Sequence, residues 1–117
     1  MPLRKAAKKS SNTASRITKA RLAAMIEEAT VDAYGDSEQT AGWYTMLEEH
    51  LALPFETTVL GVTVQVARLD LRGDNDIVVI CTRGREQQAV LILDLPLPWP
   101  RPVGAEWIDA YRHWIEG

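Results

Sequence analysis

Apolar residues recur at helical spacing in the first third of the chain after Ser15. One stripe consists of Leu22, Met25, Ile26 and Ala29, and the glutamates at 27 and 28 fall on the opposite side. The β-branched Thr30 and Val31 predict that this helix fades between residues 29 and 33. Gly35 then allows a turn or a helix C-cap.

A second helix is predicted from Glu38 to about Leu51, with Ser37 as its N-cap. Its apolar stripe consists of Trp43, Tyr44, Leu47 and Leu51. Pro54 prevents the helix from continuing. Gly42 lowers the helix propensity by roughly 1 kcal/mol relative to alanine.

In residues 57–95, apolar and polar residues alternate or apolar residues follow one another without interruption, and both patterns are typical of β-strands. Val62, Val64 and Val66 define one face of the stretch TTVLGVTVQVARLDL, and polar or small residues define the other. The turns RGDND and GRE separate this stretch from two further strands, DIVVICTRG and QQAVLILDL. Gly61 indicates a bulge or sharp bend. Three or four strongly bent antiparallel strands of this length favour a small, open, SH3-like barrel over a flat sheet.

The stretch PLPWPRPVG, with prolines at 96, 98, 100 and 102, follows the strands. Its spacing suits a ligand of SH3 domains, because a polyproline II helix exposes alternate side chains. We favour a stiff strap that returns the chain across the barrel, because an ordered element follows at once. That element is a last helix, whose stripe consists of Trp107, Ile108, Tyr111, Trp114 and Ile115.

These elements predict an α+β fold over residues 17–117, with an N-terminal helix pair, a small SH3-like antiparallel β-barrel and a C-terminal helix. Charge separates this domain from the start of the chain. Residues 1–21 hold seven of the thirteen basic residues and no acid. We expect residues 1–16 to form a basic, disordered tail.

Residues 22–117 carry the other six basic residues against all 16 acids, a formal charge of −10. Such a charge concentrates cations near the surface and repels nucleic acid. We therefore expect no nucleic-acid partner except through the basic tail. The chain has no long apolar run, so we expect neither a secretory signal nor a membrane span.

Cys81 is the single cysteine and lies in the apolar run IVVIC. No intramolecular disulfide is possible, and the cytoplasm is the expected location. A lone cysteine in a strand pattern is usually a small buried hydrophobe. Since His50 and His113 are the only histidines, the chain cannot assemble a cysteine–histidine zinc cluster.

Three acids, Asp32, Asp36 and Glu38, surround Gly35 where the second helix is about to begin. One interpretation is electrostatic, because the helix dipole stabilises an acid near the N-terminus by roughly 0.3–1 kcal/mol. The other is a calcium site, because calcium takes six to eight oxygen ligands and prefers carboxylates and backbone carbonyls. Residue types alone favour capping.

A second acidic group lies in DLRGDND and contains Asp70, Asp74 and Asp76. The pattern lacks the spaced acids, glycine and terminal glutamate of an EF-hand loop. A polar hairpin turn explains it, and its carboxylates are further candidates for the same cation across space. Nothing singles out an acid–base pair, a phosphate loop or a nucleophile motif, so we expect no enzymatic activity.

Two longer blocks, DAYGDSEQTAGWYTMLEEHLALPF and ILDLPLPWPRPVGAEWIDAYRHW, resemble a family of small bacterial calcium-binding proteins typified by CcbP. The resemblance covers roughly residues 27–117. It implies cytoplasmic calcium binding, as buffer or sensor, by an acidic pocket without an EF-hand on a helix-plus-barrel scaffold.

The resemblance favours a metal role for Asp36 and Glu38 over capping alone, with Asp32 next and Asp70, Asp74 or Asp76 as contributors. Gathered carboxylates repel one another without the ion, so removal of Asp36 or Glu38 is expected to stabilise the calcium-free protein. The alternative is a non-enzymatic interaction module that docks an unidentified protein on its barrel face or proline-rich strap.

Overall fold

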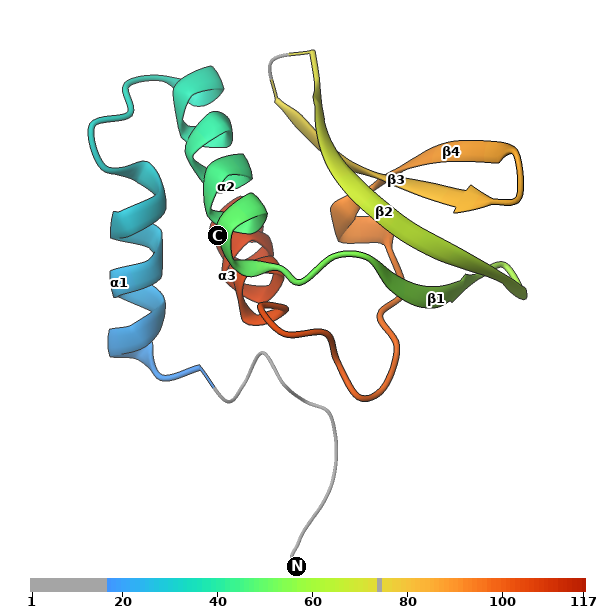
Figure 1. Cartoon of the computed structure of the whole chain (residues 1–117). Coiled ribbons are helices and arrows are strands. Elements are labelled where there is room, and N and C mark those ends of the chain that lie inside the picture. Colours follow the sequence, from blue (N-terminus) through green and yellow to red (C-terminus); the bar gives the residue numbers. More distant parts are fainter. Residues whose placement is uncertain (1–16, 74) are drawn as a thin grey trace, which may run out of the picture.

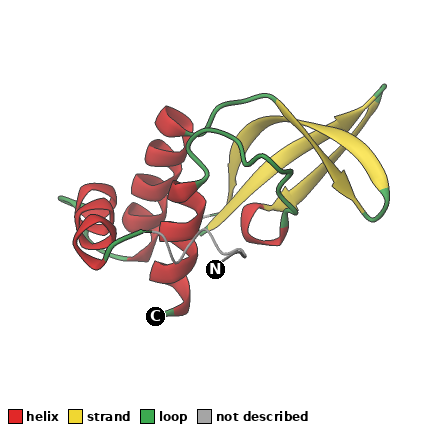
Figure 2. Ribbon diagram, turned by 90° about the horizontal axis from the view of Figure 1, so that it is seen from below, coloured by secondary structure: helices red, strands yellow, loops and turns green. Residues whose placement is uncertain are grey.

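The computed structural model describes residues 17–73 and 75–117, which form three α-helices and one four-stranded antiparallel sheet. The helices lie together on one side of the sheet (Figures 1 and 2). The fold is therefore α+β, as the sequence predicts. The elements are α1 (Lys19–Thr30), α2 (Asp36–His50), β1 (Phe55–Val59), β2 (Val62–Arg72), β3 (Asp76–Arg83), β4 (Glu86–Leu91), the 3-10 turn η3 (Ile92–Asp94) and α3 (Glu106–Glu116). Among the described residues, every helix is too short or too polar to cross a bilayer.

The predicted N-cap of the second helix is wrong by two residues. Helix α2 begins at Asp36, and its N-cap is Gly35 with φ 97°, a left-handed conformation that glycine adopts without steric cost. Ser37 therefore lies inside the first turn. Helix α1 has a side-chain cap of the expected kind, since Thr18 accepts a hydrogen bond from the backbone N–H of Arg21 at 3.0 Å.

A cluster of aromatic rings joins α2 to α3. Trp43 of α2 is fully buried, and its ring centroid lies 6.3 Å from Trp107, 5.6 Å from Tyr111 and 5.8 Å from Trp114. The apolar stripes predicted for these helices are the ones that pack, with one correction. Ile115 is 51% exposed, because α3 turns that side chain away from the cluster.

The sheet is a simple meander in the order β1-β2-β3-β4. Leu60 and Gly61, with φ 51° and 80°, form the two-residue turn between β1 and β2. The register between β2 and β3 shifts between Val66 and Arg68, which marks a bulge that bends the long strand β2.

The predicted SH3-like barrel is not confirmed, because β1 and β4 are not paired and the sheet stays open. The last predicted strand, residues 87–95, is also too long. Strand β4 ends at Leu91, and η3 follows. This turn places Ile92 and Leu95 in the core at 1% and 6% exposure, whereas a continuing strand would put residues three apart on opposite faces.

The proline-rich segment lies along the domain as a strap between η3 and α3. The Thr57 hydroxyl donates to the carbonyl of Pro96 at 2.7 Å, and the Ala52 N–H donates to the carbonyl of Val103 at 2.8 Å. Arg101 holds Asp109 of α3 with two hydrogen bonds of 2.8 Å. These contacts confirm the strap interpretation, while Trp99 stays 79% exposed.

Gly42 marks the place where α1 and α2 cross. A Cβ at this position would collide with the backbone carbonyl oxygen of Ala29. The glycine that weakens the helix propensity is therefore required by close backbone packing.

We expect Gly42→Ala to lower the free energy of unfolding by about 2 kcal/mol, because the helices must separate to admit the methyl group. This loss should appear although alanine has the better helix propensity. The exposed neighbour Ala41 provides the control, since Ala41→Gly should cost only the propensity difference of about 1 kcal/mol. Urea denaturation measures both, and a Gly42→Ala variant as stable as the parent would contradict the crossing geometry.

Candidate metal centre

The N-terminal end of α2 lies beside the turn between β2 and β3 (Figure 1). A contact joins them: the hydroxyl oxygen of Thr40 lies 3.4 Å from the side-chain oxygen Oδ1 of Asn75, while the single proton of this hydroxyl is shared with the nearer carbonyl of Asp36. The same hydroxyl lies 2.9 Å from the backbone carbonyl of Asp36, and Thr40 is only 4% exposed. The link therefore holds Asp36 at the end of the helix close to the turn that contains Asn75 and Asp76.

Glu38 joins α2 to the turn that precedes it. Its Oε1 accepts a hydrogen bond from the backbone N–H of Tyr34 at 2.8 Å, one residue before the N-cap. Asp36 and Glu38 are two residues apart in a helix, so their side chains leave the axis about 200° apart. The two acids do not share one face of α2.

Two further predicted acids lie on different elements of the described chain. Asp32 is exposed in the α1–α2 connection with φ 59°. Asp76 is exposed at the start of β3. The pKa of Tyr111 is raised, first by burial of the phenol and then by the negative charge of Asp76. Asp74 lies outside the described residues.

Asp70 of β2 is engaged by its own strand. Its Oδ2 pairs with Nε of Arg72 at 2.9 Å, and its Oδ1 accepts the N–H of Leu71 at 2.9 Å. The hydrogen bond from Arg72 is the main reason that the pKa of Asp70 lies below its usual value. Asp70 is therefore less available to a metal ion than an acid without protein partners.

A further oxygen-rich contact lies beside Asp70. The hydroxyl of Tyr44 donates to Glu48 at 3.1 Å and lies 3.5 Å from the carbonyl of Leu69. Burial first, and then Glu48 and Asp70, raise the pKa of Tyr44.

Within residues 17–73 and 75–117, no group of three or more His, Cys, Asp or Glu side chains is arranged to hold a metal ion. Thr40, Asp36, Asn75 and Asp76, where α2 meets the β2–β3 turn, carry hydroxyl, carboxylate and amide oxygens, and oxygen is the ligand type that calcium requires. The junction therefore fits a hard cation by chemistry, and the ligand set predicted from Asp36, Glu38, Asp32, Asp70, Asp74 and Asp76 stays a prediction.

Sequence reasoning missed Thr40 altogether. A threonine inside a helix commonly donates a hydrogen bond to the carbonyl four residues earlier, as Thr40 does to Asp36. Only the structure shows that Thr40 also contacts Asn75. No sequence signal pairs residues 40 and 75.

The fold and this junction describe a small acidic α+β domain with oxygen donors for a hard cation. A family model described as calcium binding, of the CcbP type, matches residues 23–115. The chain belongs to this family of calcium-binding proteins. No curated protein and no solved structure matches it.

The structure reverses the expected effect of one substitution on the calcium-free protein. Because Glu38 accepts a hydrogen bond from the backbone N–H of Tyr34, we expect Glu38→Ala to lower the free energy of unfolding in a calcium chelator by about 1 kcal/mol. Glu49→Ala, at an exposed position of the same helix, is the control for loss of one negative charge. Equal stability of both variants in thermal denaturation would show that the hydrogen bond between Glu38 and Tyr34 contributes nothing.

Proposed function

We propose that this protein binds Ca²⁺ at the junction of α2 with the β2–β3 turn and serves as a cytoplasmic calcium buffer or sensor rather than as an enzyme. The supporting observation is the contact between Thr40 and Asn75, which joins the first turns of α2, where Asp36 lies, to the β2–β3 turn that precedes Asp76. Family membership supports the ion.

Asp36 and Asp76 would be the primary carboxylate ligands, and the Asn75 side-chain oxygen and backbone carbonyls would complete the oxygen set. Asp74 precedes Asn75 in the sequence and is the next candidate, while Asp32 and Glu38 follow. Glu38 and Asp70 already have protein partners, so their use would break hydrogen bonds that stabilise the fold.

The electrostatics of the domain favour the proposal. Residues 22–117 carry a formal charge of −10, which raises the local concentration of cations. Ligands from two elements suit calcium, which accepts flexible coordination, better than magnesium, which demands a near-ideal octahedron. Bound calcium would join helix and hairpin and remove repulsion between their acids.

We expect thermal unfolding of the chelator-treated protein to shift upward in millimolar calcium and not in magnesium. Calcium at 100 times its dissociation constant stabilises the folded state by about 2.7 kcal/mol, a shift on the order of 10 °C for a domain of this size. Asp36→Asn and Asp76→Asn should each reduce the shift strongly.

Glu28→Gln is the matched control, because it removes one negative charge from an exposed position of α1. It should leave the calcium shift nearly unchanged. Equal shifts with calcium and magnesium, or equal losses in all three variants, would indicate diffuse screening and contradict a site at the junction. Retention of the full shift in both aspartate variants would place the site elsewhere.

A further inference from the structure

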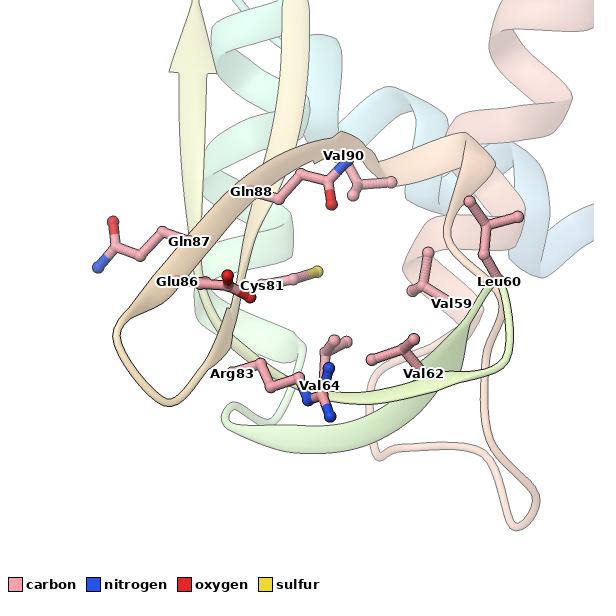
Figure 3. Close-up of a pocket in the computed structure, with 10 residues that line it drawn as sticks. All are labelled: Val59, Leu60, Val62, Val64, Cys81, Arg83, Glu86, Gln87, Gln88 and Val90. Atoms are coloured by element: carbon pink, nitrogen blue, oxygen red, sulfur yellow. The ribbon is translucent and has the colours of Figure 1, made fainter.

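A pocket of about 570 Å³ lies at the end of the sheet opposite the β2–β3 turn. Figure 3 shows its walls: Val59, Leu60 and Val62 face Gln88 and Val90 across the opening, with Cys81 between the two walls. The pocket is therefore bounded by the two strands that a closed barrel would pair. It is separate from the junction proposed for calcium.

The apolar face of β2 continues into this pocket after the core has ended. Along that face, Val66 is fully buried while Val62 is 37% exposed. Beyond it, Leu60 is 96% exposed and has a left-handed φ of 51°, a costly conformation for a residue with a branched side chain. A contiguous apolar surface with a polar rim is typical of an interaction site.

The edge of β4 offers backbone groups beside the pocket. On the other side of the sheet, the strap contacts β1 through the Thr57–Pro96 hydrogen bond. Strand β4 has β3 on one side and no strand of the described chain on the other. Its sequence EQQAVL contains no lysine or proline, the residues that commonly protect an edge from another strand.

The positive charge at the beginning of β4 indicates which chemical group a peptide bound at this strand edge would carry there. Arg83 and Arg85 flank the β3–β4 turn with exposed side chains, and the ion pairs among the described residues involve Arg72, Arg101 and Arg112 instead. With Glu86 the turn carries a net charge of +1 in a domain that is otherwise strongly acidic. A carboxylate is favoured at this end of the strand.

We propose that β4 binds an extended peptide of a partner protein, antiparallel to the strand, with a free C-terminal carboxylate beside Arg83 and Arg85. Antiparallel addition matches the rest of the sheet and brings the C-terminus of the peptide to the beginning of β4. Alternate apolar side chains of the peptide enter the valine-lined pocket and cover Leu60.

The charges of the chain disfavour two other occupants. The basic residues 1–16 would meet Arg83 and Arg85, and a second copy would bring together two domains that each carry −10 over residues 22–117. A short apolar peptide with one carboxylate avoids both kinds of repulsion.

The proposal can be tested with the full chain and an N-terminally fluorescein-labelled peptide of sequence GSTVTVTV. We expect saturable fluorescence anisotropy in a calcium chelator, so that the result does not depend on calcium binding. Val62→Lys should weaken binding at least tenfold, because it places a charge in the apolar pocket. Arg83→Gln and a C-terminally amidated peptide should each weaken it by roughly threefold to tenfold.

Val103→Lys is the control for Val62→Lys, since Val103 is an exposed valine of the strap, 77% exposed, and should leave affinity unchanged. Circular dichroism confirms that each variant is folded. Two further peptides carry N-methyl groups on every threonine or on every valine. Only one should lose binding, because alternate residues of a strand direct their N–H groups to a given neighbour.

Four outcomes would overturn the proposal. The first is that the wild-type chain, at millimolar concentration, causes no change in anisotropy. The second is that Val62→Lys and Val103→Lys weaken peptide binding equally, and the third is that both N-methylated peptides bind with full affinity. A wild-type dimer in sedimentation that Val62→Lys dissociates would also overturn it, in favour of a second copy as the occupant.

Discussion

The burial of Trp43 is the constraint on which the arrangement of the domain depends. Its ring contacts Trp107, Tyr111 and Trp114 of α3, so the first and last parts of the described chain share one core. Gly42, its neighbour, allows α1 to pack closely against the same helix. Removal of large buried aromatic side chains typically costs 3–5 kcal/mol, about half the stability of a small domain. The position of α2 is thus fixed on two sides.

This fixed helix gives the proposed calcium site its location. The N-terminal end of α2 meets the β2–β3 turn through Thr40 and Asn75. Among the described residues, the ion pairs involve neither Asp36 nor Asp76. Asp109, in contrast, is neutralised by Arg101, and Asp70 by Arg72. Some acids therefore stabilise the fold through ion pairs, and under the proposed function others would bind the cation.

The two ends of the sheet differ in chemistry. One end, at the β2–β3 turn, is acidic and faces α2, while the other presents apolar side chains, an open strand edge and two arginines. Because β2 and β3 run between both ends, a calcium ion and a peptide would occupy opposite ends of the same strands without competing for residues.

The sequence by itself determined the α+β class, the helix stripes around Trp43 and Trp107, the strap and the acidic charge, because these follow from local periodicity, proline chemistry and composition. It also contained the family resemblance that the family model confirms. Tertiary structure alone decided that the sheet stays open, that Glu38 accepts a hydrogen bond from Tyr34 and that Thr40 meets Asn75. These features depend on distances between residues far apart in the chain or on backbone angles such as φ of Gly35, which no pattern of residue types specifies.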